Sequence, residues 1–207
     1  RPAGGQTLMH PNPLFRTEDR DLMETLVDQI GFGMVFLTTP DGPRVAHTPL
    51  LSTGDGAVQF HLARGNALTR HLEGATALVT VNGPDAYVSP RWYAERDAVP
   101  TWDYVALELE GRVRRLADEG LEAFLHALIE KHENRLGEAG WQAQEATTST
   151  WNTLFRGIVG FEMEVRAWRP TLKLSQKCSP EERGTIAAGL AASGSPALAQ
   201  LMGQLVP

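Results

Sequence analysis

The stretch VQFHLARGN, residues 58–66, decides the fold, because it changes from a strand pattern to a helix signal around one turn. Apolar and polar side chains alternate over its first half, as in a strand with one buried face. The alternation then stops, and Asn66 stands as an N-cap before a helix expected over residues 67–72. A helix N-terminus beside the Arg64 guanidinium would receive an anion such as a phosphate. An ordinary solvated connection is the alternative interpretation of this turn.

The residues before this stretch predict two more strands of the same kind. Residues 34–39 and 44–51 are rich in β-branched and aromatic side chains, and turn sequences of Gly, Pro and Asp follow each of them. Two hairpins in succession indicate an antiparallel meander rather than alternating strands and helices. A helix over residues 18–30, capped by Thr17, is expected ahead of the meander.

Later segments continue the same architecture. Strands are expected over residues 75–81, 86–89, 105–114 and 159–167, with a turn between the first two. A helix over residues 119–132 is expected to be capped by Asp118 and to be followed by a polar loop. Two C-terminal helices begin at Ser-Pro pairs, the first of which forms a capping box. The sequence therefore predicts a mainly β fold with peripheral helices, an antiparallel barrel of about six to seven strands.

Length and composition limit the organisation and the partners of the chain. With 207 residues and a net charge of −6, it fits one domain and repels nucleic acid unless basic residues gather on one face. Neither a helix-turn-helix pattern nor an apolar run long enough to span a membrane stands out. We expect residues 1–8 to be a flexible extension or a remnant of the expression vector, and residues 9–207 to be one domain with a helical tail. Cys178 is the only cysteine, which fits a reducing compartment and predicts a cytoplasmic protein.

The common catalytic and metal-binding patterns are missing from the sequence. No serine stands in a G-x-S-x-G elbow, and the surroundings of Cys178 give no sign of an activated thiol. The histidines lack a compact ligand spacing with carboxylates, and glycine fingerprints for dinucleotides or a P-loop are absent. The sequence therefore predicts neither a catalytic residue nor a metal site.

Four polar or aromatic segments beside the strands remain, at residues 46–50, 61–66, 87–102 and 173–176. Each has an ordinary structural interpretation. The histidine of the first segment would be a surface residue of an edge strand, and the aromatic residues of the third would close one end of the barrel. The last segment would be a polar linker to the first C-terminal helix.

Together with neighbouring residues, these segments form a series of motifs from Met9 to about Leu201. In chain order they are His10-Pro11-x-x-x-Phe15, Gly31-Phe32-Gly33, Ala46-His47-x-Pro49-Leu50-Leu51, His61-Leu62-Ala63-Arg64-x-Asn66, Gly83-Pro84-x-Ala86-Tyr87-x-Ser89-Pro90-x-Trp92-Tyr93, Val99-Pro100-Thr101-Trp102-x-Tyr104, Arg156-x-Ile158-Val159-Gly160-Phe161-Glu162, Lys173-Leu174-Ser175-Gln176 and Glu182-Arg183. In these motifs and in their order, the chain resembles the PaiB-type family of FMN-binding negative transcriptional regulators. That resemblance implies the flavin-binding split-barrel fold.

The resemblance also implies a cofactor site. FMN would bind at the interface of a homodimer, each site using both subunits. Arg64 and Asn66 would hold the phosphate, and Trp92 or Trp102 would cover the ring. His47 and Thr48 would lie along the ribityl chain or the ring edge, and Lys173, Ser175 and Gln176 would come from the partner subunit. The complete implied set of cofactor-binding residues is His47, Thr48, Pro49, Leu50, His61, Leu62, Ala63, Arg64, Asn66, Trp92, Trp102, Lys173, Ser175 and Gln176.

Three functions are consistent with this sequence. The first is an FMN-binding protein with a negative transcriptional regulatory role, exerted indirectly through a ligand, a partner or redox state rather than by reading DNA. The second is an FMN-dependent oxidoreductase or flavin reductase, since flavin chemistry needs little from the protein beyond placement and electrostatics. The third is a structural protein that descends from this family but no longer binds flavin. Glu108 and Glu110 suggest it, because they add negative charge where the family pattern has a histidine and an aromatic residue.

Overall fold

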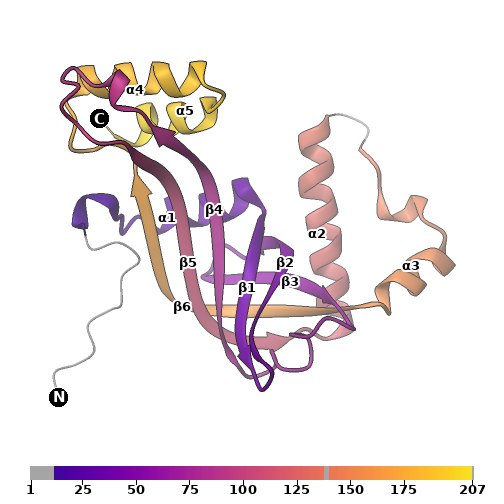
Figure 1. Cartoon of the computed structure of the whole chain (residues 1–207). Helices are drawn as coiled ribbons and strands as arrows, with labels where there is room; N and C mark the ends of the chain where they lie inside the picture. Colours follow the sequence, from indigo (N-terminus) through magenta and orange to yellow (C-terminus); the bar gives the residue numbers. More distant parts are fainter. Residues whose placement is uncertain (1–11, 138–139, 207) are drawn as a thin grey trace. The chain divides into compact units, whose positions relative to one another are not determined.

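The computed structural model describes residues 12–137 and 140–206 (Figure 1). These residues form two compact units. We call residues 24–81 with 109–137 and 140–168 the barrel unit, and residues 12–23, 82–108 and 169–206 the tail unit. Three long strands contribute residues to both. The extension expected at residues 1–8 and the motif that begins at His10 fall outside the described residues, the motif in part.

The strands close into an antiparallel barrel, as the alternating sequence predicts (Figure 1). Antiparallel pairing is seen between β1 and β2, β2 and β3, β3 and β6, and β1 and β4. Around the barrel the strand order is β1-β2-β3-β6-β5-β4. The strands are β1 (Phe32–Thr39), β2 (Gly42–Ser52), β3 (Ala57–Ala63), β4 (Thr76–Val88), β5 (Thr101–Arg115) and β6 (Ile158–Lys173).

The stretch that decides the fold behaves as a strand with one buried face. Val58, Phe60 and Leu62 are buried in the barrel, while Gln59 and His61 between them are half-buried on its outer face. The Phe60 ring stacks on that of Phe161 across the pairing of β3 with β6, with centroids 5.6 Å apart. The strand expected from the alternation is therefore confirmed.

The prediction of a helix directly after this strand is wrong, because residues 67–71 form successive turns instead. The Thr69 N–H donates to the Asn66 carbonyl at 3.1 Å, and the His71 N–H donates to the Leu68 carbonyl at 2.8 Å. Asn66 does cap the segment, since its Oδ1 accepts from the Leu68 N–H at 2.9 Å. So short a segment cannot sustain a helix by propensity alone, and burial of its leucines fixes the turns instead.

Two further sequence expectations need correction. No turn interrupts β4 at residues 82–85, because Gly83 packs so closely on Val105 that a Cβ there would lie 3.0 Å from the valine Cβ. This close cross-strand packing outweighs the local turn chemistry of Asn-Gly-Pro-Asp. Helix α1 (Arg20–Ile30) is capped by Asp19, whose Oδ1 accepts from the Leu22 N–H at 3.0 Å, rather than by Thr17.

Three helices lie between β5 and β6 in the chain, and the first contacts β3 through the rings of Phe124 and His61. They are α2 (Asp118–Leu136), η3 (Ala143–Glu145) and α3 (Thr148–Phe155). Leu116, Leu121 and Phe124 form a second apolar cluster, against which partly buried residues of β2, α2 and α3 pack. The polar pattern before residue 150 predicts only a loop, so α3 was not expected. The N-cap of α2 is Ala117, so the predicted cap Asp118 is instead its first helical residue.

The tail unit ends in the two helices that the Ser-Pro pairs predict. Ser179 accepts a hydrogen bond from the Glu182 N–H at 3.2 Å and so caps α4 (Pro180–Ala192), whereas Ser195 makes no side-chain cap for α5 (Pro196–Leu205). Two short 3-10 helices, η1 (Pro13–Phe15) and η2 (Pro90–Trp92), complete this unit. Among the helices of the described residues, none combines the length and the apolar character needed to cross a membrane.

Candidate functional site

In the barrel unit, strands β2 and β3 bring the predicted site residues of both strands together. Thr48 is buried, and its hydroxyl donates to the His61 carbonyl at 2.6 Å. His47 points the other way and is exposed, its ring stacked 6.5 Å from that of Phe32. Leu50 and Leu62 belong to the barrel core, so any contact they make with a cofactor must come from their backbone. The Leu50 N–H is already used, since it donates to the Gly31 carbonyl at 2.9 Å.

The His61 imidazole lies against helix α2. Its ring centroid is 5.8 Å from that of Phe124, at an angle of 58°. Nδ1 is buried and has no hydrogen-bond partner among the described residues. Burial lowers the pKa of His61 below its ordinary value of 6.5, so the ring is neutral at pH 7.

Arg64 lies at the end of β3 and is fixed by the turn that leads into β6. Its Nε donates to the Arg156 carbonyl at 2.9 Å, and its Nη2 donates to the Ile158 carbonyl at 3.2 Å. The Arg64 N–H donates to the Gly157 carbonyl at 2.8 Å. An exposed positive charge is therefore held at a defined place, but two of its donors are already used by carbonyl groups. The helix N-terminus that the sequence predicts beside it is not formed.

In the tail unit, the predicted residues of β5 and β6 converge on one buried carboxylate. Ser175 donates to Asp103 Oδ2 at 2.5 Å, and Lys173 Nζ lies 3.7 Å from Asp103 Oδ1. Lys173 also donates to the Thr101 hydroxyl and to the Trp102 carbonyl. The segment that contains Lys173 and Ser175 is thus tied to β5 and is not a free polar linker.

Gln176 closes the turn after β6. Its Nε2 donates to the Leu172 carbonyl, and its Oε1 accepts from the Leu174 N–H at 2.8 Å. Ser175 between them has φ of 54°, in the left-handed region that a non-glycine residue rarely adopts. The side-chain hydrogen bonds of Gln176 offset the cost of this backbone conformation.

Asp103 itself is absent from the residues that the sequence predicts for the site. Its side chain is fully buried, and Oδ1 accepts no hydrogen bond from a described residue. Burial raises the pKa of Asp103, while the hydrogen bond from Ser175 and the charge of Lys173 partly oppose that rise. The signal in the sequence is positional, because Asp103 occupies an inward position of a strand whose next inward residues are Val105 and Leu107.

Aromatic side chains line a cavity of about 620 Å³ in the tail unit. The Trp102 side chain is 51% exposed, its Nε1 donates to Asp85 Oδ1 at 2.9 Å, and its ring meets that of Tyr87 edge-on at 6.3 Å. Trp92 lies against Gly189 of α4, where an added Cβ would overlap its ring. Exposed indole faces of this kind stack readily on flat ring systems.

A family model described as "Putative FMN-binding domain" matches residues 9–167. The chain belongs to this family. It is 31% identical over 167 residues to "Protease synthase and sporulation protein PAI 2" of Bacillus subtilis (strain 168), covering 78% of this chain and 79% of that protein. An uncharacterized protein of Emericella nidulans is 29% identical over 189 residues, covering 75% of each chain. The PaiB-type resemblance of the motifs is thereby confirmed.

Solved structures show the same fold. The FAD and heme binding protein from Mycobacterium smegmatis superposes with a TM-score of 0.59 at 20% identity, covering 84% of this chain and 79% of that one. A conserved hypothetical protein from Mycobacterium tuberculosis gives a TM-score of 0.57 at 12% identity, covering 81% and 92%. The chain is therefore a member of the FMN-binding family with the flavin-binding split-barrel fold, and its cofactor is FMN.

Two groups of described side chains suit the chemistry of FMN, one its flat ring system and the other its phosphate. The aromatic cavity of the tail unit suits the flat isoalloxazine, and the fixed Arg64 of the barrel unit suits a phosphate. Glu108 does not stand as an isolated negative charge, because Arg169 lies 3.8 Å from it. Glu108 therefore adds no uncompensated negative charge to the tail unit.

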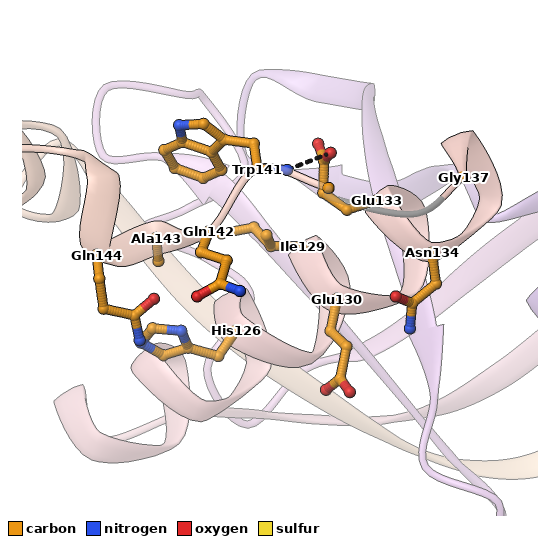
Figure 2. Close-up of a pocket in the computed structure, with 11 residues that line it drawn as sticks. His126, Ile129, Glu130, Glu133, Asn134, Gly137, Trp141, Gln142, Ala143 and Gln144 are labelled. Atoms are coloured by element: carbon orange, nitrogen blue, oxygen red, sulfur yellow. Dashed lines mark hydrogen bonds between the residues drawn. The ribbon is translucent and has the colours of Figure 1, made fainter.

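A polar cavity of about 450 Å³ lies beside the C-terminal half of α2 (Figure 2). His126, Glu130 and Glu133 line it, and the Trp141 N–H donates to Glu133 Oε2 at 2.9 Å. None of the cofactor residues implied by the family resemblance lines this cavity. Across residues 12–137 and 140–206, no three His, Cys, Asp or Glu side chains gather as a metal site would require.

Proposed function

We propose that this protein is an FMN-binding regulator that acts as a homodimer, with FMN at the subunit interface, and that it affects transcription without reading DNA itself. The observation that carries the proposal is the family match across residues 9–167. The Bacillus subtilis relative adds support, since its name connects that protein with protease synthesis and sporulation. A single cysteine is typical of proteins in a reducing compartment, so the proposal includes a cytoplasmic location.

In this proposal the phosphate meets Arg64 and Asn66, while His47, Thr48 and the backbone of Pro49 and Leu50 follow the ribityl chain and the ring edge. Trp92 or Trp102 covers the isoalloxazine, which supplies one- or two-electron redox chemistry when bound. The support is local to each unit. The arginine is held in place by two carbonyl groups, and the two indoles share one cavity.

The partner subunit supplies Lys173, Ser175 and Gln176 to the same flavin. Each unit carries an exposed aromatic side chain within one of the family motifs. Phe32 of the barrel unit is 52% exposed, and Trp102 of the tail unit is 51% exposed. A second copy that covers these side chains would remove them from water and complete the cofactor site.

Direct DNA reading has no support in this chain. The net charge of −6 opposes approach to phosphates, and the regular helix α2 carries three acidic residues in its first turn and a half, with basic residues only near its end. Regulation would then act through a small ligand, a protein partner or the redox state of the flavin. Tight, salt-sensitive and sequence-specific binding of a DNA fragment by the purified protein would contradict this part of the proposal.

The decisive experiment is a visible absorption spectrum of the protein after incubation with FMN and removal of the excess. We expect a yellow dimer with one flavin per chain. Arg64→Ala should weaken flavin binding about tenfold to a hundredfold, the effect of removing a charge-assisted hydrogen bond. Arg70→Ala is the matched control, since Arg70 is an exposed arginine of the next turn that pairs with Asp41.

Three results would overturn parts of the proposal. An Arg64→Ala protein that keeps the wild-type flavin stoichiometry and affinity would remove Arg64 from the phosphate site. Rapid bleaching of the bound flavin by NADH or NADPH would instead assign the FMN-dependent oxidoreductase alternative. Sedimentation of the flavin-loaded protein as a monomer would exclude a site that needs both subunits.

A further inference from the structure

The Trp102 indole in the aromatic cavity of the tail unit is held on two sides. Its Nε1 donates to Asp85 Oδ1 at 2.9 Å, and its ring meets that of Tyr87 edge-on at 6.3 Å. Asp85 and Tyr87 are two positions apart on β4, the neighbour of β5 in the barrel, so both side chains approach the indole from one face of the sheet. The backbone of Trp102 is fixed as well, because its carbonyl accepts from Lys173. The indole therefore has a defined orientation before any ligand arrives.

Asp85 is an unexpected residue in a cavity that suits FMN. It lines the cavity together with the indole, and it stands at an unspecified position of its family motif. A carboxylate repels the phosphate of FMN, so the charge of Asp85 alone works against the cofactor. The hydrogen bond that its side chain makes to a described residue goes to Trp102. Because the acceptor is a carboxylate, this bond is charge-assisted and stronger than one between neutral groups.

We propose that Asp85 is a positioning residue, which holds the Trp102 indole as a preformed wall for the isoalloxazine ring. The role rests on the proposed function, in the form in which Trp102 covers that ring. A half-exposed tryptophan that is free to rotate loses side-chain freedom when a ring stacks on it, and fixing the side chain in advance removes that cost. Asp85 thus strengthens binding of the ring through the indole, although its charge opposes the phosphate.

Titration with FMN, followed by quenching of the flavin fluorescence, tests this role through the sign of the change in affinity. Asp85→Ala removes both the charge and the acceptor, and it should weaken FMN binding about threefold to tenfold, the effect of ordering one side chain on binding. Asp85→Asn removes the charge but keeps Oδ1, and it should bind FMN at least as tightly as the wild type. Asp97→Ala is the control for charge, because Asp97 is an exposed acid of the same unit outside the cavity, and it should not weaken binding.

A double-mutant cycle determines whether Asp85 acts through the indole. Trp102→Phe keeps an aromatic ring but has no ring N–H, so Asp85→Ala should weaken FMN binding no further in that background. Riboflavin, which lacks the phosphate, separates the ring from the charge. Asp85→Ala should weaken riboflavin binding by the same factor as FMN binding, because the effect arises at the ring.

The heteronuclear NMR spectrum of the ligand-free protein reports the same hydrogen bond without FMN and shows that each variant is folded. The indole N–H signal of Trp102, identified by its loss in Trp102→Phe, should shift and exchange faster with water in Asp85→Ala, and Asp85→Asn should largely restore it.

The outcomes separate this role from the function on which it rests. Wild-type FMN affinity in Asp85→Ala, an equal loss in Asp85→Asn, or additive losses in the cycle would each overturn the positioning role alone. An indole signal that Asp85→Ala leaves unchanged would do the same. Absence of FMN binding by the wild-type protein would instead overturn the proposed function, and the role of Asp85 at the flavin with it.

Discussion

Replacement of Asp103 by asparagine should stabilise the protein at neutral and alkaline pH. The carboxylate is fully buried, receives one hydrogen bond from Ser175 at 2.5 Å, and has an Oδ1 with no hydrogen bond from a described residue. Lys173 lies 3.7 Å away, too far for a hydrogen bond, and already donates to Thr101 and to the Trp102 carbonyl. An amide of the same shape keeps the serine hydrogen bond and removes a buried charge that is only partly compensated.

The size of the effect follows from the buried charge. Keeping a partly compensated carboxylate buried costs about 1–3 kcal/mol, and loss of the ion pair with the largely buried Lys173 offsets part of the gain. We therefore expect a net stabilisation of about 1–2 kcal/mol at pH 8. For a chain of this length that corresponds to a rise in Tm of about 2–8 °C.

The pH dependence of the effect identifies its cause. Burial raises the pKa of Asp103 above its ordinary value of 3.8, so the wild-type protein loses stability relative to the variant as the pH rises from that value through the folded-state pKa. Well below pH 3.8 the carboxyl is protonated in both states and the difference should nearly vanish. Thermal unfolding followed by circular dichroism between pH 4.5 and pH 8 measures this trend. A lower Tm of Asp103→Asn at pH 8, or a gain of equal size at both ends of the range, would refute the reasoning.

The control for this experiment is Asp41→Asn. Asp41 pairs with Arg70 at 3.5 Å, and both side chains are largely exposed. Exposed pairs of this kind contribute less than about 1 kcal/mol, so the substitution should change Tm little at any pH in the range. A stabilisation of the control equal to that of Asp103→Asn would indicate a general charge effect rather than relief at the buried site.

Three further outcomes follow from packing and burial. Gly189→Ala overlaps the indole that packs on α4 and should cost about 1–3 kcal/mol in a denaturant titration, whereas Gly184→Ala in the same helix meets no neighbour and should add up to about 1 kcal/mol. Burial raises the pKa of the Cys178 thiol to about 11, so its labelling by a disulfide reagent at pH 8 should be about a hundredfold slower than that of free cysteine and should accelerate above pH 10. Gly111→Ala would drive a methyl group into the Glu164 carbonyl, so circular dichroism should show loss of the folded barrel.

The strands could be predicted from the sequence because burial of one face leaves a period of two that is visible without any structure. Residues 58–62 show this pattern, and β3 contains them all. Helix boundaries were harder to predict, because tertiary packing decided them. Residues 67–72 carry helix-forming side chains, yet Leu68 and Leu72 are fully buried and hold the segment in turns. Helix α3 was missed for the related reason that Thr147, an ordinary loop residue in the sequence, caps it through its hydroxyl.

The candidate site could be predicted as a set of residues but not as a set of contacts. The motif that contains Arg64 identified a cation at the end of a strand, but it could not show that carbonyl groups of residues 156 and 158 already use two of its donors. Asp103 stands at an unspecified position of its motif, and the motif does not reveal that this position lies on the buried side of β5. Side-chain contacts between segments about 70 to 90 positions apart depend on strand register, which the sequence alone did not fix.

Strand β3 gives indirect regulation a physical route. The His61 ring lies against helix α2, the His61 carbonyl receives the Thr48 hydroxyl, and Arg64 at the end of the same strand is fixed to the entrance of β6. Strand β3 therefore joins the proposed phosphate ligand to the side chains that pack on its outer face. In the proposed function, a molecule that alters this packing acts on the FMN site through β3. Thermodynamic linkage then requires FMN to change the affinity for that molecule by the same factor by which the molecule changes the affinity for FMN.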